Sequence, residues 1–449
     1  MVILHPMQIQ IPNEVRFVLQ GLEADGKEAA IVGGCVRDVL RGEKPKDWDV
    51  TTNATPEEIQ KIFPNHLYEN RFGTVTVHSG TQDVEVTPYR SEAQYTDKRH
   101  PDRVTFGVSL EEDLARRDFT INAMAMRMDG DLIDFFGGQK DLEKFLIRSV
   151  GDPRERFSED ALRLLRAIRF AAQLKARIEP KTWSAIIELR KNIRAVAGER
   201  VRDELMKMLA TDYPILAVWK IFESGMLNII LPELAEGVGM TQNKHHVYTV
   251  FFHNLMALQH CPSDDPLVRL AAFLHDVGKS RTKEGDGSDS TFYHHDHVGA
   301  EMTRTLMRRL RFSKEEIERV SHLVDMHLFH YSVGEVTDKG VRRLLRRVGV
   351  EHMDDLMAVR IADRMGSGCQ VEVPYKLQEL QERIIEVQKD PIDTRMLEVD
   401  GHDVMTLLNI SPGPKIGEVL NVLLEEILDD PQKNTREVLE KRILELGAR

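Results

Sequence analysis

Residues 29–38 read AAIVGGCVRD, a short apolar run that ends in two glycines and continues with helical spacing. The run predicts a buried strand over 29–32, and the glycine turn predicts the start of a helix over 35–41. Two glycines let the backbone approach a phosphate closely, and the free N–H groups of a helix N-terminus can bind it. The stretch is therefore a candidate phosphate-binding turn, with a tight turn that binds nothing as the alternative.

Two aspartates follow this unit, Asp47 and Asp49 in the sequence DWDV. On a strand, alternation places both side chains on one face, a few ångströms apart. Like charges this close are unfavourable unless a cation lies between them, and Mg²⁺ with a nucleoside triphosphate is the expected partner. Glu85, on an alternating run over 84–86, is a candidate third carboxylate. An exposed strand face without a ligand is the alternative for the two aspartates alone.

Adjacent arginines, Arg116 and Arg117, open the stretch RRDFTINA. Guanidinium groups bind triphosphate oxygens in bidentate fashion, so a second phosphate-binding element is expected here. The alternative is a solvated helix start in which Asp118 pairs with the arginines.

Taken in order, these motifs resemble the family of class II tRNA nucleotidyltransferases and bacterial poly(A) polymerases. The pattern GGxxRD, DxD and RRDxTINA continues with IDFFGG, EDALRLLRAIRF and ERVRDEL, at residues 133–138, 159–170 and 199–205. The resemblance implies a polymerase-β-like head in which Asp47 and Asp49 hold Mg²⁺. It also implies that the 3′-hydroxyl of tRNA attacks the α-phosphate of CTP or ATP and that pyrophosphate leaves.

The resemblance further implies a nucleotide-binding set, made up of Gly33, Gly34, Arg37, Arg117, Asp160, Arg163, Arg166 and Arg169. Asp160 and Arg163 are three residues apart, and on a helix they would share one face. A carboxylate beside a guanidinium can pair with a base edge, and in the family this pair selects CTP or ATP without a nucleic-acid template. Ser158 is expected as the N-cap of this helix. A solvated basic stripe is the alternative for the three arginines.

The polar segment 87–107 lies where the family carries a flexible loop that helps the switch from C to A addition. Its presence disfavours a CC-only enzyme but does not separate a CCA-adding enzyme from an A-adding one. Residues 123–125, Ala-Met-Ala, follow RRDFTIN, and no basic segment precedes the two glycines. Both features disfavour a bacterial poly(A) polymerase, which stays the nearest alternative together with the A-adding enzyme.

A second group of candidate metal ligands lies farther along the chain, at His253, His275, Asp276 and Asp363. Imidazole and carboxylate groups bind Mn, Fe, Ni, Co or Zn, and such a metal lowers the pKa of bound water for phosphoester hydrolysis. The pattern resembles the HD phosphohydrolase superfamily. The resemblance implies a second divalent transition metal (Ni, Mn, Co or Fe) and cyclic phosphates or phosphomonoesters as substrates.

Four of the histidines between Asp276 and Asp363 are of interest as well. His297 and His327 are candidate additional ligands, at positions where HD proteins often supply them, whereas His294 and His295 are expected in a loop beside the site. A degenerate HD domain with a structural role is the alternative, because intact ligands do not establish turnover.

The overall charge excludes a generic basic nucleic-acid coat, since the 449-residue chain has a net charge of −12. The segments 160–207 and 304–347 are nevertheless locally basic, and 371–449 is acidic. No apolar run approaches the ~20 residues of a membrane span, and no signal peptide is evident. The three cysteines are far apart, which favours a reducing cytoplasm.

We therefore expect an α+β protein with a small nucleotidyltransferase head and a mostly helical body that contains an HD domain. The expected divisions are a head at 1–150, a nucleotide-selecting and RNA-binding region at 151–238, an HD domain at 239–370 and a helical acidic tail at 371–449. The expected partners are the tRNA 3′ end, CTP, ATP and Mg²⁺, without a membrane. An HD phosphohydrolase with a nucleotide-sensing head and a silent RNA-binding module are the alternatives from other classes.

Overall fold

The computed structural model describes residues 10–69, 73–80, 82–93, 103–242, 247–285, 287–368 and 375–448. The chain forms two compact units, Met1–Ile230 and Leu231–Arg449. The first unit contains a mixed sheet and helices, and the second is built mainly of helices, which confirms the expected fold class. No helix in the described ranges is long and apolar enough to cross a membrane. The finer division into four parts stays a prediction.

The sheet of the first unit has seven strands within the described residues, in the order β3-β4-β5-β2-β1-β8-β9. Their bounds are β1 (Ala29–Val32), β2 (Asp49–Thr52), β3 (His66–Glu69), β4 (Thr74–Ser79), β5 (Gln82–Pro88), β8 (Ala125–Met126) and β9 (Leu132–Ile133). All four residues of β1 are buried, as expected of a continuous apolar run at the centre of a sheet. The strand is antiparallel to both of its neighbours, β2 and β8.

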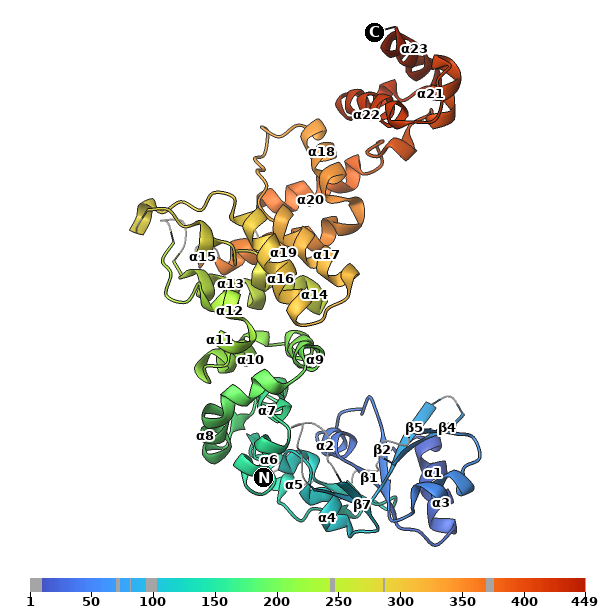
Figure 1. Ribbon diagram of the computed structural model, residues 1–449, viewed down its shortest axis with the longest axis vertical. Coiled ribbons are helices and arrows are strands. Elements are labelled where there is room, and N and C mark those ends of the chain that lie inside the picture. Colours follow the sequence, from blue (N-terminus) through green and yellow to red (C-terminus); the bar gives the residue numbers. More distant parts are fainter. Residues whose placement is uncertain are drawn as a thin grey trace. The chain divides into compact units, whose positions relative to one another are not determined.

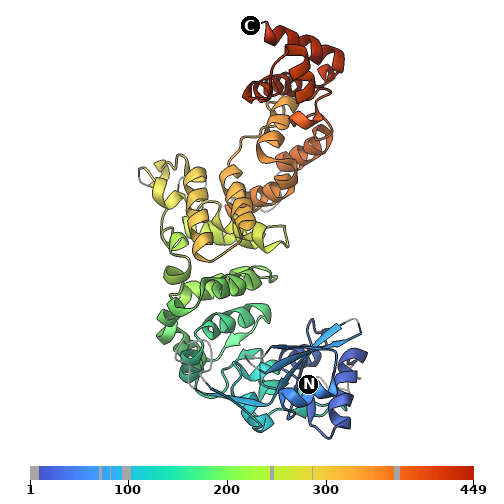
Figure 2. The ribbon, with the colours of Figure 1, turned by 45° about the vertical axis from the view of Figure 1, so that its right-hand side comes forward.

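Two helices, α1 (Asn13–Ala24) and α3 (Pro56–Ile62), pack against the sheet (Figure 1; Figure 2). The buried residues of α1, Val15, Val18, Leu19 and Leu22, follow helical spacing and join the core on this face. Helix α2 (Gly34–Leu40) begins directly after β1, which makes the expected strand–turn–helix unit.

The rest of the first unit consists of short strand pairs and helices. The strand pairs are β6 (Arg90–Ala93) with β7 (Arg103–Phe106), and β10 (Leu146–Ile147) with β11 (Arg177–Ile178). The helices are α4 (Leu110–Ala115), η1 (Thr120–Asn122), α5 (Gly138–Glu143), α6 (Pro153–Glu159), α7 (Leu162–Gln173), α8 (Pro180–Leu189), η2 (Arg190–Ala195), α9 (Gly198–Leu209), α10 (Pro214–Glu223) and α11 (Leu227–Ile230). The expected loop over 87–107 coincides in part with β6 and β7, and its residues 94–102 lie outside the described ranges.

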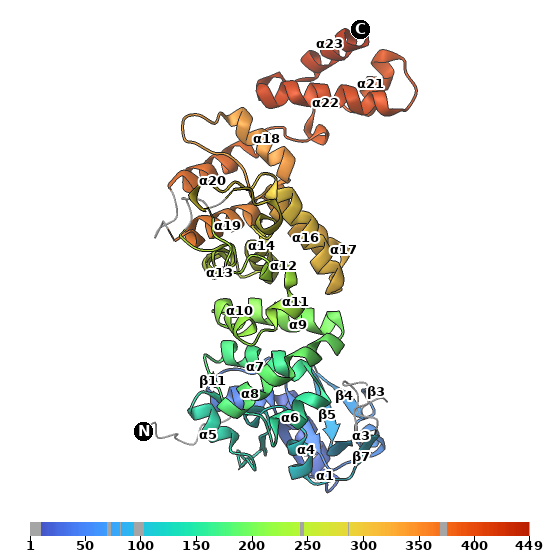
Figure 3. The same ribbon diagram turned by 60° about the vertical axis from the view of Figure 1, so that its left-hand side comes forward.

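In the second unit, α13 packs against α14 and α19, and α16 packs along α17 (Figure 1; Figure 3). The helices are α12 (Pro232–Ala235), α13 (Val250–His260), α14 (Pro266–Leu274), α15 (Lys279–Thr282), η3 (Gly287–Asp289), α16 (His295–Arg309), α17 (Lys314–Met326), α18 (Asp338–Val348), α19 (Val350–Gly366), α20 (Tyr375–Val387), η4 (Thr394–Met396), α21 (Gly401–Leu408), α22 (Pro414–Asp429), η5 (Pro431–Lys433) and α23 (Arg436–Gly447). This packing brings together residues from distant parts of the sequence.

Candidate functional site

A cleft of about 460 Å³ lies in the first unit and joins the glycine turn, the RRD stretch and the start of α7. The predicted site residues that line this cleft are Gly33, Gly34, Arg37, Asp49, Arg117, Asp160, Arg163, Arg166 and Arg169. The structure therefore gathers the whole predicted nucleotide-binding set around one cavity. It also adds Arg200 from α9, which sequence reasoning did not assign to the site.

Three carboxylates lie around the point where β2 begins. Asp49 is the first residue of β2, and Asp47 precedes the strand by two residues instead of lying within it. Asp49 and Glu85 are direct partners in the parallel pair β2–β5, so their side chains leave the sheet on the same face. Burial raises the pKa of Asp49; Arg117 opposes this shift, and the charge of Asp47 adds to it. Oxygen ligands that repel one another in this way fit a hard cation such as Mg²⁺.

The glycine turn and the arginines are held together by close packing. Gly33 has φ 81°, and a Cβ there would lie 2.8 Å from Nη1 of Arg117. A side chain at this position would therefore strain the backbone and displace the arginine. Arg37 donates from Nη1 to Asn122 Oδ1 at 2.7 Å, which orients its guanidinium within the cleft. Arg117 also lies 3.5 Å from the buried carboxylate of Asp113.

Asp118 organises another part of the cleft wall. Its Oδ2 accepts a hydrogen bond from Arg166 Nε at 2.7 Å, and its Oδ1 accepts one from Asn122 Nδ2 at 3.1 Å. Burial opposes ionisation of this carboxyl, but Arg166 and Asn122 outweigh burial and lower the pKa of Asp118 to about 2. The pairing of Asp118 and Arg166 is thus an internal ion pair.

Asp160 and Arg163 line the cleft, but the expectation that they share one helix is wrong. Helix α6 ends at Glu159, Asp160 has extended backbone angles, and α7 begins at Leu162. Ser158 lies inside the last turn of α6, so it is not the expected N-cap. The extended residue lets the Asp160 carboxylate turn toward a partner on another helix.

That partner is Arg200, whose Nη1 and Nη2 donate to the two oxygens of Asp160 at 3.2 and 2.8 Å. Arg163 pairs instead with Glu159 at 2.6 Å, and it also donates to the backbone carbonyl oxygens of residues 156 and 116. Each member of the predicted base-reading pair is therefore fixed by its own partner. The ERVRDEL motif was the signal for Arg200, but a motif alone does not reveal which side chain an arginine contacts.

Arg169 lines the cleft and is almost fully buried. Its Nε donates to Oε2 of the buried Glu204 at 2.6 Å, and its guanidinium lies 4.0 Å from the ring centroid of Phe170. The expected nucleotide contacts of Arg166 and Arg169 stay predictions, since both charges already have acidic partners within the chain.

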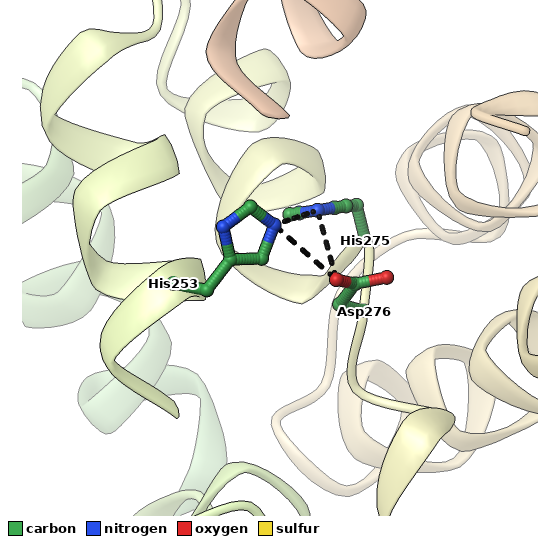
Figure 4. Close-up of side chains that lie close together, drawn as sticks. All are labelled: His253, His275 and Asp276. Carbon is green, nitrogen blue, oxygen red and sulfur yellow. Dashed lines mark hydrogen bonds and ion pairs between the residues drawn. The ribbon is translucent and has the colours of Figure 1, made fainter. Parts of the chain in front are cut away.

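A buried cluster of histidines and aspartates lies in the second unit. His253 comes from α13, and His275 and Asp276 follow α14 (Figure 4). Asp363 comes from α19. The Nε2 of His253 lies 3.0 Å from His275 Nε2, 3.2 Å from Asp276 Oδ2 and 3.3 Å from Asp363 Oδ1. The four residues expected to form one metal site are thus together.

Two further histidines complete the cluster on the other oxygen of Asp276. His295 Nε2 lies 3.2 Å and His327 Nε2 lies 3.7 Å from Asp276 Oδ1. His295 is therefore a member of the cluster. The expectation that it lies in a loop is wrong, because α16 begins at this residue. His297 is not brought into the cluster, since its side chain is exposed and pairs with Asp325 at 2.6 Å.

A glycine contact sets the position of His295. A Cβ on Gly278 would lie 2.1 Å from the carbonyl oxygen of His295 and 2.5 Å from the backbone nitrogen of Gly299. The chain after Asp276 can therefore approach the first turn of α16 only because residue 278 has no side chain. This close approach places Asp276 between the two groups of histidines.

Backbone hydrogen bonds orient three of the histidine rings. The Nδ1 atoms of His275, His295 and His327 lie 2.6–2.8 Å from the carbonyl oxygens of residues 272, 292 and 324. A carbonyl oxygen can only accept, so each Nδ1 carries a proton and each Nε2 faces the cluster. A metal-binding histidine typically has this arrangement, with one nitrogen donating to the protein and the other directed at the metal.

Cations and protons balance the buried carboxylates. Lys279 Nζ lies 2.5 Å from Asp276 Oδ2, and Arg360 Nη1 lies 2.5 Å from Asp363 Oδ2. Burial opposes a charge on His275, but the two aspartates outweigh burial and raise its pKa to about 10. A divalent metal would displace the proton between this ring and the carboxylates, so the donor set fits a transition metal such as Ni, Mn, Co or Fe.

Three family models match successive parts of the chain. The Poly A polymerase head domain matches residues 29–148, and the probable RNA and SrmB-binding site of polymerase A matches residues 177–237. The tRNA nucleotidyltransferase domain 2 matches residues 291–443. The cleft described above lies within the first two regions and the segment between them.

Whole-chain relatives agree with these models. The CCA-adding enzyme of Lactobacillus helveticus is 32% identical over 96% of both chains. The A-adding tRNA nucleotidyltransferase of Deinococcus radiodurans is 33% identical over 88% of this chain and 91% of that protein. Among solved structures, the Bacillus stearothermophilus CCA-adding enzyme in complex with CTP aligns over 97% of both chains, with a TM-score of 0.73 and 25% identity.

Proposed function

We propose that this chain, which belongs to the family of CCA-adding tRNA nucleotidyltransferases, adds C and A residues to the tRNA 3′ end from CTP and ATP. The observation that carries the proposal is the single cleft that combines Asp49, the glycine turn, the RRD arginines and Asp160. Metal-ligand, triphosphate-binding and base-reading groups thus line one cavity. Activity in the cytoplasm stays a prediction.

Residues at the sheet end of the cleft serve the transfer step. Asp47 and Asp49 hold Mg²⁺, with Glu85 beside Asp49; Asp49 lines the cleft, whereas Asp47 and Glu85 are not part of its lining. Arg37 and Arg117 bind the triphosphate next to the glycine turn. Bound Mg²⁺ lowers the pKa of the attacking hydroxyl and neutralises the leaving pyrophosphate, and the family uses this ion. The protein residues fix the nucleotide so that its α-phosphate faces the 3′-hydroxyl of tRNA.

Asp160 and Arg163 select the base. Cytosine and adenine each present an amino donor next to a ring-nitrogen acceptor, which matches a carboxylate acceptor beside a guanidinium donor. Uracil and guanine present a carbonyl acceptor and an N–H donor in the reverse order, and they would leave both protein groups unpaired. Because Arg200 and Glu159 hold the two side chains, they are oriented before the nucleotide arrives.

The test uses tRNA substrates that end before CCA, after C and after CC, each offered with labelled CTP or ATP. We expect CMP on the first two and AMP on the third, and we expect Asp49→Ala to abolish all three additions. Undiminished addition by Asp49→Ala would refute the metal assignment. AMP addition without any CMP addition would identify an A-adding enzyme, the activity named for the Deinococcus radiodurans relative.

A second candidate function rests on the histidine–aspartate cluster. The Nε2 atoms of His253, His275, His295 and His327 surround Asp276, and Asp363 closes the group. We propose that this HD-like centre binds a divalent transition metal and hydrolyses phosphoesters such as 2′,3′-cyclic AMP. A bound metal supplies an activated water for this reaction.

Metal analysis and hydrolysis test this second function separately from nucleotide addition. Purified protein should contain Ni, Mn, Co or Fe by mass spectrometry, and Asp276→Ala should lose both the metal and the hydrolysis of 2′,3′-cyclic AMP. A metal content unchanged by Asp276→Ala would contradict the site. A full metal load without hydrolysis would favour a structural role.

A further inference from the structure

A cavity of about 340 Å³ lies in the second unit, outside the sites described so far. It is lined by the segment after α17, by the last turns of α19 and by the start of α20. Three cationic side chains, Arg360, Arg364 and Lys376, share the lining with the aromatic residues Phe329 and Tyr331. This combination of cations and planar rings is suited to a phosphate that carries an aromatic base.

The cavity adjoins the histidine–aspartate cluster through Arg360. One nitrogen of Arg360 contacts Asp363 Oδ2 at 2.5 Å, and its guanidinium lies 5.5 Å from the ring centroid of Phe329 in the cavity wall. The Asp363 side chain is 12% exposed, against 0% for His253 and 3% for Asp276. Arg360 therefore links the cavity lining directly to a carboxylate of the cluster.

Two of the three positive charges of the cavity have no ion-pair partner among the described residues. Arg364 and Lys376 are exposed, and neither forms an ion pair with a residue in the described part of the chain. The cavity lining contains no carboxylate among the described residues. Two unpaired cations beside a third that is shared with Asp363 favour the binding of an anion.

We propose that this cavity binds a nucleoside carrying a terminal phosphate, with the phosphate on Arg360, Arg364 and Lys376 and the base against the aromatic wall. The proposal rests on the hydrolase centre proposed above, for which it supplies the substrate pocket. The same chemistry is found in a free mononucleotide and in the phosphorylated 3′ end of an RNA. Both ligands would present their phosphate toward the Asp363 side of the cluster.

Calorimetric titration of the full-length, metal-depleted protein with adenosine 3′-monophosphate tests the pocket. The double variant R364Q/K376Q should weaken binding by at least about tenfold, because two charge-assisted contacts are lost. R117Q should leave this binding in place, which separates it from binding in the cleft of the first unit. R308Q, which changes an exposed arginine of α16 outside the cavity, is the matched control.

A short RNA with a 3′-phosphate, titrated in parallel, identifies the source of the ligand. Tighter binding of the RNA than of the mononucleotide, with the same loss in R364Q/K376Q, assigns the pocket to RNA ends; the reverse order assigns it to free nucleotides. Binding that is absent in the wild type, or equal in R364Q/K376Q, overturns the proposal. Nucleotide binding that depends on these residues and persists in Asp276→Ala supports the pocket even if hydrolysis is never observed.

Discussion

The pairing of Asp160 with Arg200 predicts that Arg200 controls nucleotide selection by orienting the Asp160 carboxylate. Two hydrogen bonds of 3.2 and 2.8 Å, both between charged groups, hold the carboxylate from a separate helix. A hydrogen bond to a charged group contributes about 2 kcal/mol, which corresponds to about 30-fold in kcat/KM when it orients a group in the transition state. Because the side-chain amide of Gln can replace one of the two donors, about one such hydrogen bond is lost, and we expect Arg200→Gln to lower kcat/KM for CTP and ATP by about 30-fold.

The assay measures CMP addition to tRNA lacking CCA and AMP addition to tRNA ending in CC, together with UMP misincorporation. A free Asp160 side chain should lower discrimination against UTP, and Arg200→Lys should restore part of it. Arg202→Gln is the control, because Arg202 lies on the same helix, pairs with Asp203 and is not part of the cleft lining. A lower melting temperature with unchanged selectivity in Arg200→Gln would show a merely structural contact and refute the reasoning.

Three other substitutions test single contacts. Because the pKa of Asp118 falls from 3.8 to about 2 on folding, the ionised form of this carboxyl, held mainly by Arg166 and Asn122, contributes about 2 kcal/mol above pH 4. This contribution is lost as the pH falls through 2, so the stability difference between wild type and Asp118→Asn in urea unfolding should shrink over this range; a constant difference would contradict the assignment. Gly33→Ala should raise KM for CTP at least about tenfold, because residue 33 has a positive φ and a Cβ there would lie 2.8 Å from Nη1 of Arg117. An unchanged KM would show that this turn does not bind the triphosphate. Gly278→Ala should displace His295 and lower the free energy of unfolding by about 1–3 kcal/mol. The metal content should fall as well, and full metal occupancy would show that Gly278 does not position His295.

The local parts of the fold could be predicted because they depend on neighbouring residues. The apolar run over 29–32 and its two glycines determine a strand and a turn whatever lies around them, and β1 and α2 lie where expected. The order of the motifs predicted that Asp49 and Arg117 belong to one site, and both line the same cleft.

The contacts that the sequence could not predict are those between residues far apart along the chain. The break between α6 and α7 at Asp160 places its carboxylate against Arg200, 40 residues away, and helical spacing alone contains no information about that contact. Whether His295 or His297 joins the cluster depends on where α16 begins, because residues two apart on a helix face nearly opposite sides. A packing contact at Gly278 sets that register.

The pairing of Asp276 with Lys279 and of Asp363 with Arg360 has a consequence for how the second unit folds without metal. Each buried carboxylate has a cation of the chain beside it, so neither negative charge is left uncompensated before any metal binds. Folding of the second unit is then largely independent of metal supply, unlike a site whose bare carboxylates need the ion in order to fold. The helices around the cluster should therefore stay folded when a metal-chelating agent is added.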